Sequence, residues 1–237
     1  MRLTLKAFAV AALAALGATG ASAQSSEHPV VVELFTSQGC SSCPPADKLL
    51  KELSARDDVI ALALHVDYWD YIGWKDVFAD PRFSARQKAY AVAGGRRSVY
   101  TPQMIIDGSD HVVGTHPMDV ADLIGAHAER ARPVQLNLSR NSNGDLRIEA
   151  HATTAARTDF VVQLVRYLPE KTVEITRGEN TGKRLTYSNI VDEWEQLAEW
   201  DGHTPLTLSV PAPGNHPAVV LIQRKGPGPI EAAAILR

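Results

Sequence analysis

The sequence predicts an α/β domain followed by a small antiparallel β-sandwich, with the boundary between them near residue 132. Between residues 30 and 130, apolar runs typical of buried strands alternate with segments whose apolar residues recur at helical spacing. From residue 133 onward, short segments alternate polar and apolar residues, and connectors with Pro and Gly separate them. We therefore expect one domain over residues 24–132 and a second over residues 133–237.

Residues 1–23 have the pattern of an export signal. Arg2 and Lys6 precede a short apolar run, and Ala21-Ser22-Ala23 matches a cleavage site of small residues. The mature chain is then expected to begin at Gln24 in a secreted or periplasmic location. The apolar run is too short to span a bilayer, so no stable membrane insertion is expected after cleavage.

The charge of the chain argues against a nucleic-acid partner. The 24 basic and 27 acidic residues give a net charge of −3, and loss of Arg2 and Lys6 with the signal changes this to 22 − 27 = −5. No basic tail or basic run accompanies this acidic balance. We therefore expect no nucleic-acid binding.

The first strand is predicted over residues 30–36, an apolar and β-branched run. The next helix is predicted from Ala46, Leu49, Leu50 and Leu53, which are spaced i, i+3, i+4 and i+7. This helix could start at Cys40 or be capped by Ser42, with two prolines in its first turn, where an N–H group has no intrahelical partner. Cys40 would then lie at the positive end of the helix dipole, which favours a thiolate.

Cys40 and Cys43 are the only cysteines of the chain, and three uses compete for them. A redox pair is the favoured interpretation. A structural disulfide over two intervening residues would remove little entropy from the unfolded chain. A metal site needs further ligands, for which His65 is the candidate, and the soft thiolates would then suit Cu(I).

The second strand is predicted over residues 59–66, whose near-continuous apolar character fits a central parallel strand. Its C-terminal end lies at the same sheet edge as Cys40. The loop that follows is rich in aromatic residues, and Tyr68, Trp69 and Trp74 could form a substrate rim or pack over the sheet end. His65 could shuttle protons or bind metal, although a structural role is the favoured interpretation.

The rest of the first domain is predicted as a helix, a hairpin and a helix. Asp80 is the expected cap of a helix over residues 81–92. Thr101-Pro102 precedes a short strand, Asp107-Gly108 marks a turn, and residues 111–113 form the returning strand. A last helix is expected over residues 117–130.

This order, with Cys-x-x-Cys after the first strand and Thr101-Pro102 before the third, resembles the thioredoxin superfamily over residues 28–131. The strings GCSSCPPAD, HVDYWD and TPQMIIDG also resemble a family of exported bacterial thioredoxin-like proteins of unassigned function. The resemblance implies a central mixed sheet flanked by helices. It also implies thiol–disulfide exchange with a protein or small-molecule partner and without a cofactor.

The resemblance also implies roles for individual residues. Cys40 would be the nucleophile and Cys43 the residue that resolves the mixed disulfide. Pro102 would follow a cis peptide bond, with Thr101 pairing with the substrate backbone. Glu33 resembles the buried acid that assists proton transfer, although it lies one residue further from Cys40 than in that pattern. A copper-delivery protein and a non-catalytic adaptor with a structural disulfide remain the alternatives.

The C-terminal half is predicted to be all-β. A hairpin is expected over residues 134–150 with its turn at Asn143-Gly144. Further strands are expected over residues 160–168, 172–176, 206–210 and 218–223, and Trp194 and Trp200 are expected to pack from a short helix. The polar, glycine-rich segment of residues 177–183 is either a plain hairpin loop or a contact with the redox domain or a partner.

Overall fold

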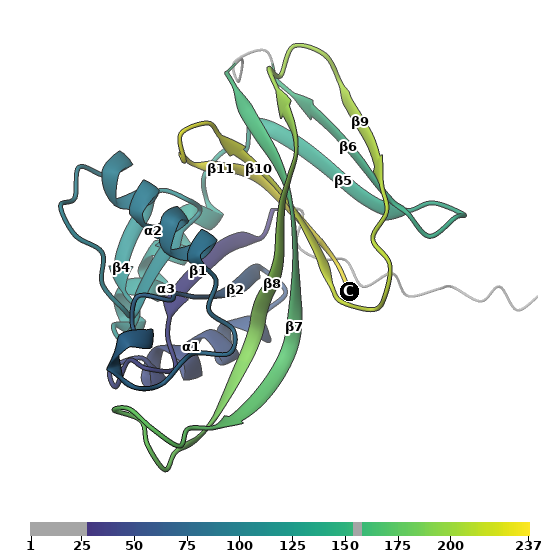
Figure 1. The fold of residues 1–237 in the computed structure, drawn as a ribbon. Coiled ribbons are helices and arrows are strands. Elements are labelled where there is room, and N and C mark those ends of the chain that lie inside the picture. Colours follow the sequence, from purple (N-terminus) through teal and green to yellow (C-terminus); the bar gives the residue numbers. More distant parts are fainter. Residues whose placement is uncertain (1–27, 154–157) are drawn as a thin grey trace, which may run out of the picture.

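The computed structural model describes residues 28–153 and 158–237, and the predicted signal of residues 1–23 lies outside these ranges. Within them the chain forms a mixed sheet of eight strands, in the order β11-β10-β7-β8-β2-β1-β3-β4, and a second sheet in the order β5-β6-β9 (Figure 1). Three α-helices flank the larger sheet. The elements are β1 Val30–Thr36, α1 Pro44–Ser54, β2 Val59–His65, α2 Pro81–Ala93, β3 Gln103–Ile106, β4 Asp110–Val113, α3 Pro117–Ala128, β5 Val134–Arg140, β6 Leu146–Ala152, β7 Phe160–Glu174, β8 Arg184–Trp200, β9 Leu206–Val210, β10 Ala218–Arg224 and β11 Ile230–Leu236.

Strands β1 and β2 are mostly apolar because helices cover both of their faces. They pair in parallel over their full length, and every residue of both strands is buried. Val30, Val32 and Leu34 pack with α1 and α3, whereas Val31 and Phe35 pack with α2. Alternate residues of one strand thus belong to two separate cores.

The strands after residue 133 do not form a separate sandwich, and this corrects the sequence prediction. Strands β7, β8, β10 and β11 extend the central sheet, and β8 pairs in parallel with β2 at Ala63 and Ile190. Asn189 reinforces this junction by donating a hydrogen bond to the carbonyl oxygen of Ala61 at 2.8 Å. Pairing with β8 satisfies backbone groups of β2 that an edge strand would leave open.

The two-layer packing of a β-sandwich is nevertheless present. Val134, Ile148 and Leu208 of the small sheet pack against residues of β7 and β10 such as Val162 and Val220. One layer of this arrangement is therefore the small sheet, and the other is the extension of the central sheet. The eight-stranded sheet contains strands from both sides of the domain boundary expected at residue 132.

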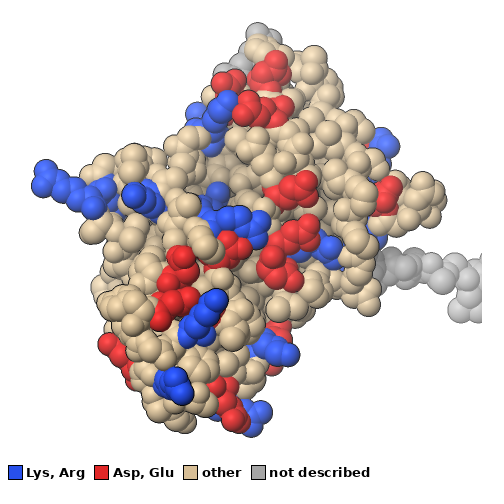
Figure 2. All heavy atoms as spheres, in the orientation of Figure 1, with Lys and Arg blue, Asp and Glu red and all other residues tan. Residues whose placement is uncertain are grey.

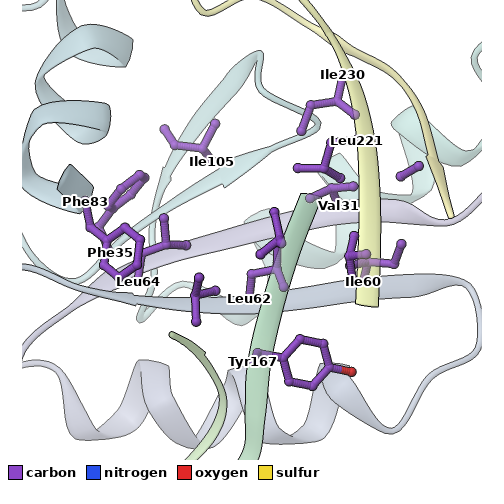
Figure 3. Packing of buried hydrophobic residues seen from close by; sticks show 14 of the residues in the cluster. Val31, Phe35, Ile60, Leu62, Leu64, Phe83, Ile105, Tyr167, Leu221 and Ile230 are labelled. Atoms are coloured by element: carbon purple, nitrogen blue, oxygen red, sulfur yellow. The ribbon is translucent and has the colours of Figure 1, made fainter. Parts of the chain in front are cut away.

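One buried core contains residues from both sides of that boundary. Val31 and Leu62 of the first half share a buried cluster with Tyr167, Leu221 and Ile230 of the second half (Figure 3). Burial of these side chains is the dominant stabilising contribution at such a contact. The two halves are thus joined by hydrogen-bonded strands and by a common apolar core.

Two other expectations differ from the structure. The segment around Trp194 and Trp200 is not a helix but the end of β8, because it pairs with β7 from Phe160 to Val165. The two strands expected over residues 160–168 and 172–176 are likewise one strand, β7. The hairpin over Asn143-Gly144 is confirmed by the pairing of β5 with β6.

The surface carries charges of both signs. Lys and Arg side chains are interspersed with Asp and Glu side chains over the face drawn in Figure 2. In the part of the chain that the structure describes, no helix is long and apolar enough to cross a membrane.

Candidate redox site

The two cysteines form a disulfide in the loop between β1 and α1. Their Cα atoms are 5.4 Å apart, and the amide of Cys43 donates a hydrogen bond to the carbonyl oxygen of Cys40 at 3.2 Å. Both residues are buried, with 2% of Cys40 and none of Cys43 exposed. The loop lies at the C-terminal edge of β1, where an α/β sheet commonly places its ligand site.

Helix α1 begins at Pro44, slightly later than the sequence predicted. Cys43 occupies the N-cap position, and Pro44 and Pro45 fill the first two helical positions. Proline suits these positions because its missing N–H would have had no partner there. The positive end of the helix dipole is therefore adjacent to the disulfide.

The peptide bond between Thr101 and Pro102 is cis, as predicted. Pro102 lies near the first turn of α1, because a Cβ atom at Gly114 would be 3.3 Å from its Cβ and 3.0 Å from that of Ala46. The Thr101 hydroxyl accepts a hydrogen bond from the indole N–H of Trp69 at 2.7 Å. The structure thus brings three features into one region: the threonine–proline pair, the start of α1, and residues 67–76, which we call the aromatic loop.

Some aromatic side chains of this loop pack against the rest of the protein, and others are exposed to solvent. The hydroxyl of Tyr68 donates to Gln87 at 3.0 Å, and its burial raises the pKa of Tyr68 to about 12. The indole of Trp74 donates to the side-chain oxygen of Gln38, within the disulfide loop, at 2.8 Å. Trp69 contacts this loop as well, because a Cβ at Gly39 would lie 3.2 Å from the Trp69 Cβ.

Tyr71 is an exposed aromatic residue that the sequence analysis did not single out. It is 81% exposed and stacks on Trp69 with 6.4 Å between the ring centroids. The aromatic loop therefore presents one open ring near the disulfide loop.

Glu33 lies on the face of the sheet away from α1. Its carboxylate accepts hydrogen bonds from the guanidinium of Arg86, at 2.6 Å, and from the hydroxyl of Tyr90, both in α2. The side chain has no exposed area. Its partners are therefore the residues of α2, and the structure does not bring it to the cysteines.

A different buried carboxyl group, that of Asp47, lies one helical turn after Cys43. The amide of Asp47 donates to the carbonyl oxygen of Cys43 at 3.1 Å, and residues four apart share one face of a helix. The Asp47 carboxylate accepts a hydrogen bond from the Thr36 hydroxyl at 2.8 Å. Burial raises the pKa of Asp47 to about 7, whereas His65 and this hydrogen bond oppose the rise.

His65 extends this polar cluster toward the disulfide loop. Its Nδ1 atom lies 2.7 Å from a carboxylate oxygen of Asp76, and the same oxygen accepts from the backbone amide of Gln38 at 2.8 Å. The ring of Tyr187 packs edge-on against His65 with 5.0 Å between centroids. Burial raises the pKa of Tyr187, and the charges of Asp47 and Asp76 add to that effect.

Three buried atoms of this cluster have no hydrogen-bond partner among the described residues: Asp47 Oδ2, His65 Nε2 and the Tyr187 hydroxyl. An unpaired polar atom in a protein interior is costly, and such atoms concentrate at functional sites. The cluster therefore retains hydrogen-bonding capacity beside the disulfide. The sequence held one signal of it, which is the i, i+4 spacing of Cys43 and Asp47.

The metal alternative has no support from this geometry. Within residues 28–153 and 158–237, no group of three or more His, Cys, Asp or Glu side chains could hold a metal ion. His65 directs one ring nitrogen at Asp76, and the two cysteine sulfurs are bonded to each other.

The segment of residues 177–183, which connects β7 and β8, contacts the disulfide loop. Asn180 donates hydrogen bonds to the carbonyl oxygens of Gln38 and Cys40, and Glu179 accepts one from the amide of Ser41. The segment is therefore a hairpin loop that contacts the first half of the chain, at the disulfide loop.

Comparisons with known proteins place the chain in a family. A crystal structure of a protein from Agrobacterium tumefaciens is 34% identical with a TM-score of 0.75, and the match covers 87% of this chain and 93% of that one. The structure of HBP35 of Porphyromonas gingivalis shares the fold, with 14% identity, a TM-score of 0.59 and coverage of 89% and 75%. None of the curated proteins matches the chain. Residues 31–223 match the family described as "Protein of unknown function (DUF1223)", and the chain therefore belongs to the DUF1223 family.

Proposed function

We propose that this protein is an exported thiol–disulfide oxidoreductase with a thioredoxin-like fold, and that Cys40 and Cys43 are its redox pair. The observation that carries the proposal is the placement of the disulfide at the start of α1, one helical turn from the buried carboxyl group of Asp47. The cis peptide bond before Pro102 and the adjacent aromatic loop support the same assignment.

The reaction proceeds through a mixed disulfide. In the direction that reduces a partner, the Cys40 thiolate attacks one sulfur of the partner disulfide, and the other partner sulfur leaves as a thiolate. The Cys43 thiolate then attacks the Cys40 sulfur, which forms the Cys40–Cys43 bond and releases the second partner sulfur. The partner gains two electrons and two protons from the cysteine pair. The same steps in reverse oxidise a partner dithiol.

Asp47 is the residue that accepts the proton of Cys43 in this proposal. A carboxyl group with a pKa of about 7 is partly ionised at neutral pH and can both accept and return a proton. Glu33, which the resemblance assigned to this task, is held by Arg86 and Tyr90 on the other face of the sheet. The proton that Cys43 gives to Asp47 balances the proton that the released partner thiolate takes up.

An inert disulfide is the competing function, and the burial of Cys40 favours it. Only 2% of Cys40 is exposed, whereas a nucleophile must be reached by the sulfur of a partner. In that case the protein would be an adaptor and the bond would act as a staple. The two functions predict different behaviour of the single cysteine variants.

Trapping of partners separates the two functions. Cys43→Ala and Cys40→Ala are expressed in the export compartment of a bacterium, quenched with acid and compared on non-reducing gels. The proposal predicts mixed disulfides from Cys43→Ala only, because nothing then releases the adduct on Cys40. Equal amounts from the two variants, or none from Cys43→Ala, would contradict it.

A further inference from the structure

We propose that the hairpin tip, defined as residues 175–183 between β7 and β8, covers the redox site and yields its place to a polypeptide partner. This inference rests on the proposed function, because it concerns how a partner reaches Cys40. The hairpin β7–β8 belongs to the C-terminal half, and its tip extends past the end of the sheet on the side of α1 (Figure 1).

Side chains of the hairpin tip form hydrogen bonds with backbone polar groups of the disulfide loop. The Asn180 amide donates to the carbonyl oxygens of Gln38 and Cys40 at 2.9 and 3.0 Å. One carboxylate oxygen of Glu179 accepts a hydrogen bond from the Ser41 amide at 3.3 Å. Asn180 is 1% exposed, so its two hydrogen bonds are shielded from water, whereas the bond between Glu179 and Ser41 is exposed.

The hairpin tip is shaped for this position. Lys183 donates a hydrogen bond to the side-chain oxygen of Asn180 at 2.8 Å, which orients the amide toward the loop. Gly178 has a φ of +77°, and a Cβ atom there would lie 3.1 Å from the Cβ of Trp74. A side chain at residue 178 would therefore meet both an unfavourable backbone angle and a close neighbour. The tip thus approaches the aromatic loop as well as the disulfide loop.

These contacts have a direct consequence for the chemistry. With the hairpin tip in place, Cys40 exposes 2% of its surface and Cys43 exposes none. Opening of the tip would expose the disulfide loop.

The groups that the hairpin tip covers define the class of partner. They are two carbonyl oxygens, which need donors, and one amide N–H, which needs an acceptor. A polypeptide backbone offers an N–H and a C=O at every residue except proline. A small thiol without peptide groups cannot replace these bonds. A partner in an extended conformation therefore matches the exposed loop, and of protein and small-molecule substrates the protein is the better fit.

The first experiment measures access to the disulfide with dithiothreitol as the probe. Asn180→Ala should be reduced at least about tenfold faster than the wild type, because two hydrogen bonds that stabilise the closed tip are lost. Asn180→Asp, which keeps the shape but removes the donors, should behave alike. Arg177→Ala is the control, since Arg177 is an exposed residue of the same tip without a hydrogen bond or ion pair to any residue that the structure describes. Equal rates in wild type, Asn180→Ala and Asn180→Asp would overturn the inference.

The second readout, hydrogen exchange at the Ser41 amide, needs no redox reaction. The amide should exchange faster in Asn180→Ala than in Arg177→Ala, because Glu179 no longer stays in place as its acceptor. An unchanged exchange rate at the Ser41 amide would contradict the inference that the hairpin tip covers the disulfide loop. If exchange is faster in Asn180→Ala but Cys43→Ala traps no mixed disulfide, the hairpin tip does cover the disulfide loop. The proposed redox function is then refuted. The two failures are therefore distinguishable.

The partner class is tested with a blocked pentapeptide of alanines around one cysteine and with 2-mercaptoethanol. For each protein, the rate of disulfide reduction by the peptide is divided by the rate with 2-mercaptoethanol. This ratio should be higher for the wild type than for Asn180→Ala, because a peptide helps to displace the tip and a simple thiol does not. Equal ratios in the two proteins would overturn the assignment to a polypeptide partner.

Discussion

At the scale of single residues, Asp47 carries an ionisable group where burial disfavours its charge. Its pKa is raised from 3.8 to about 7, and its second oxygen has no hydrogen-bond partner among the described residues. A carboxyl group whose folded-state pKa is raised stabilises the fold below its unfolded pKa and loses that contribution as the pH rises through the folded value. Asp47 should therefore lower stability between about pH 4 and pH 7 by at most roughly 4 kcal/mol.

Asp47→Asn should remove most of this pH dependence. The variant keeps an oxygen that can accept the hydrogen bond from Thr36, but it has no proton to lose. Urea unfolding from pH 4 to pH 8 should give a free energy of unfolding that falls less steeply than in the wild type. Asp122→Asn, on the exposed side of α3, is the control and should follow the wild type. Identical slopes for Asp47→Asn and the wild type would show that Asp47 ionises as freely as an exposed carboxylate.

At the scale of elements, the hairpin between β3 and β4 meets the turn between β10 and β11. Gly108 has a φ of +66°, and a Cβ atom there would lie 2.5 Å from the carbonyl oxygen of Gly228. This contact is with backbone, which cannot move aside as a flexible side chain would. Gly144 also has a positive φ, of +88°, but no atom would lie within 4 Å of its Cβ.

The two glycines should therefore respond differently to alanine. Gly144→Ala should cost about 1–2 kcal/mol, because only the backbone angle is unfavourable. Gly108→Ala should cost roughly 2–5 kcal/mol, because overpacking adds to the same backbone cost. Denaturant unfolding of the two variants measures both values. Equal losses would mean that the turns of β3–β4 and β10–β11 are not in tight contact.

The elements also show why some of the fold could be predicted and some could not. The helix at Asp80 and the turn at Asn143-Gly144 carry local signals, and the structure has both. The end of β8 lacks such a signal, because Glu195, Gln196 and Leu197 favour helices in isolation. It becomes a strand through pairing with β7, which is a contact between segments far apart in the sequence.

Some residues of the candidate site can also be predicted from local sequence signals, and others cannot. The cysteine pair and the cis proline carry short motifs, and the structure has the disulfide and the cis peptide bond. Asp47 has no such motif, because its importance depends on burial beside Thr36 and His65, which lie on other elements. The segment containing Asn180 was visible as a polar loop, but its contact with Cys40 spans 140 residues of sequence.

At the scale of the whole molecule, Arg86 of α2 connects the two halves. Its guanidinium pairs with Glu33 of β1 at 2.6 Å and donates to Gln223 of β10 at 3.1 Å. The same group lies over the ring of Trp194 in β8, 4.0 Å from the centroid. Together with the continuous sheet and the shared core, this network makes independent unfolding of the halves unfavourable.

We therefore expect a single unfolding transition. Tryptophan fluorescence and far-ultraviolet circular dichroism should give coincident urea curves, because the core that contains Val31 also contains Leu221. Residues 24–132 expressed alone should lack a cooperative transition, since Tyr167, Leu221 and Ile230 would be missing from that core. Two separate transitions, or a cooperatively folded fragment, would instead support two independent domains divided near residue 132.

The central claim, that Cys40 and Cys43 exchange electrons with a partner, is tested most directly by a redox titration. The full mature chain is equilibrated in glutathione buffers, and the reduced fraction is read by alkylation and mass spectrometry. A working redox pair should show a reversible two-electron transition between about −120 and −270 mV, the range of thiol–disulfide oxidoreductases. A disulfide that stays oxidised to potentials below about −300 mV would instead be structural and would contradict the claim.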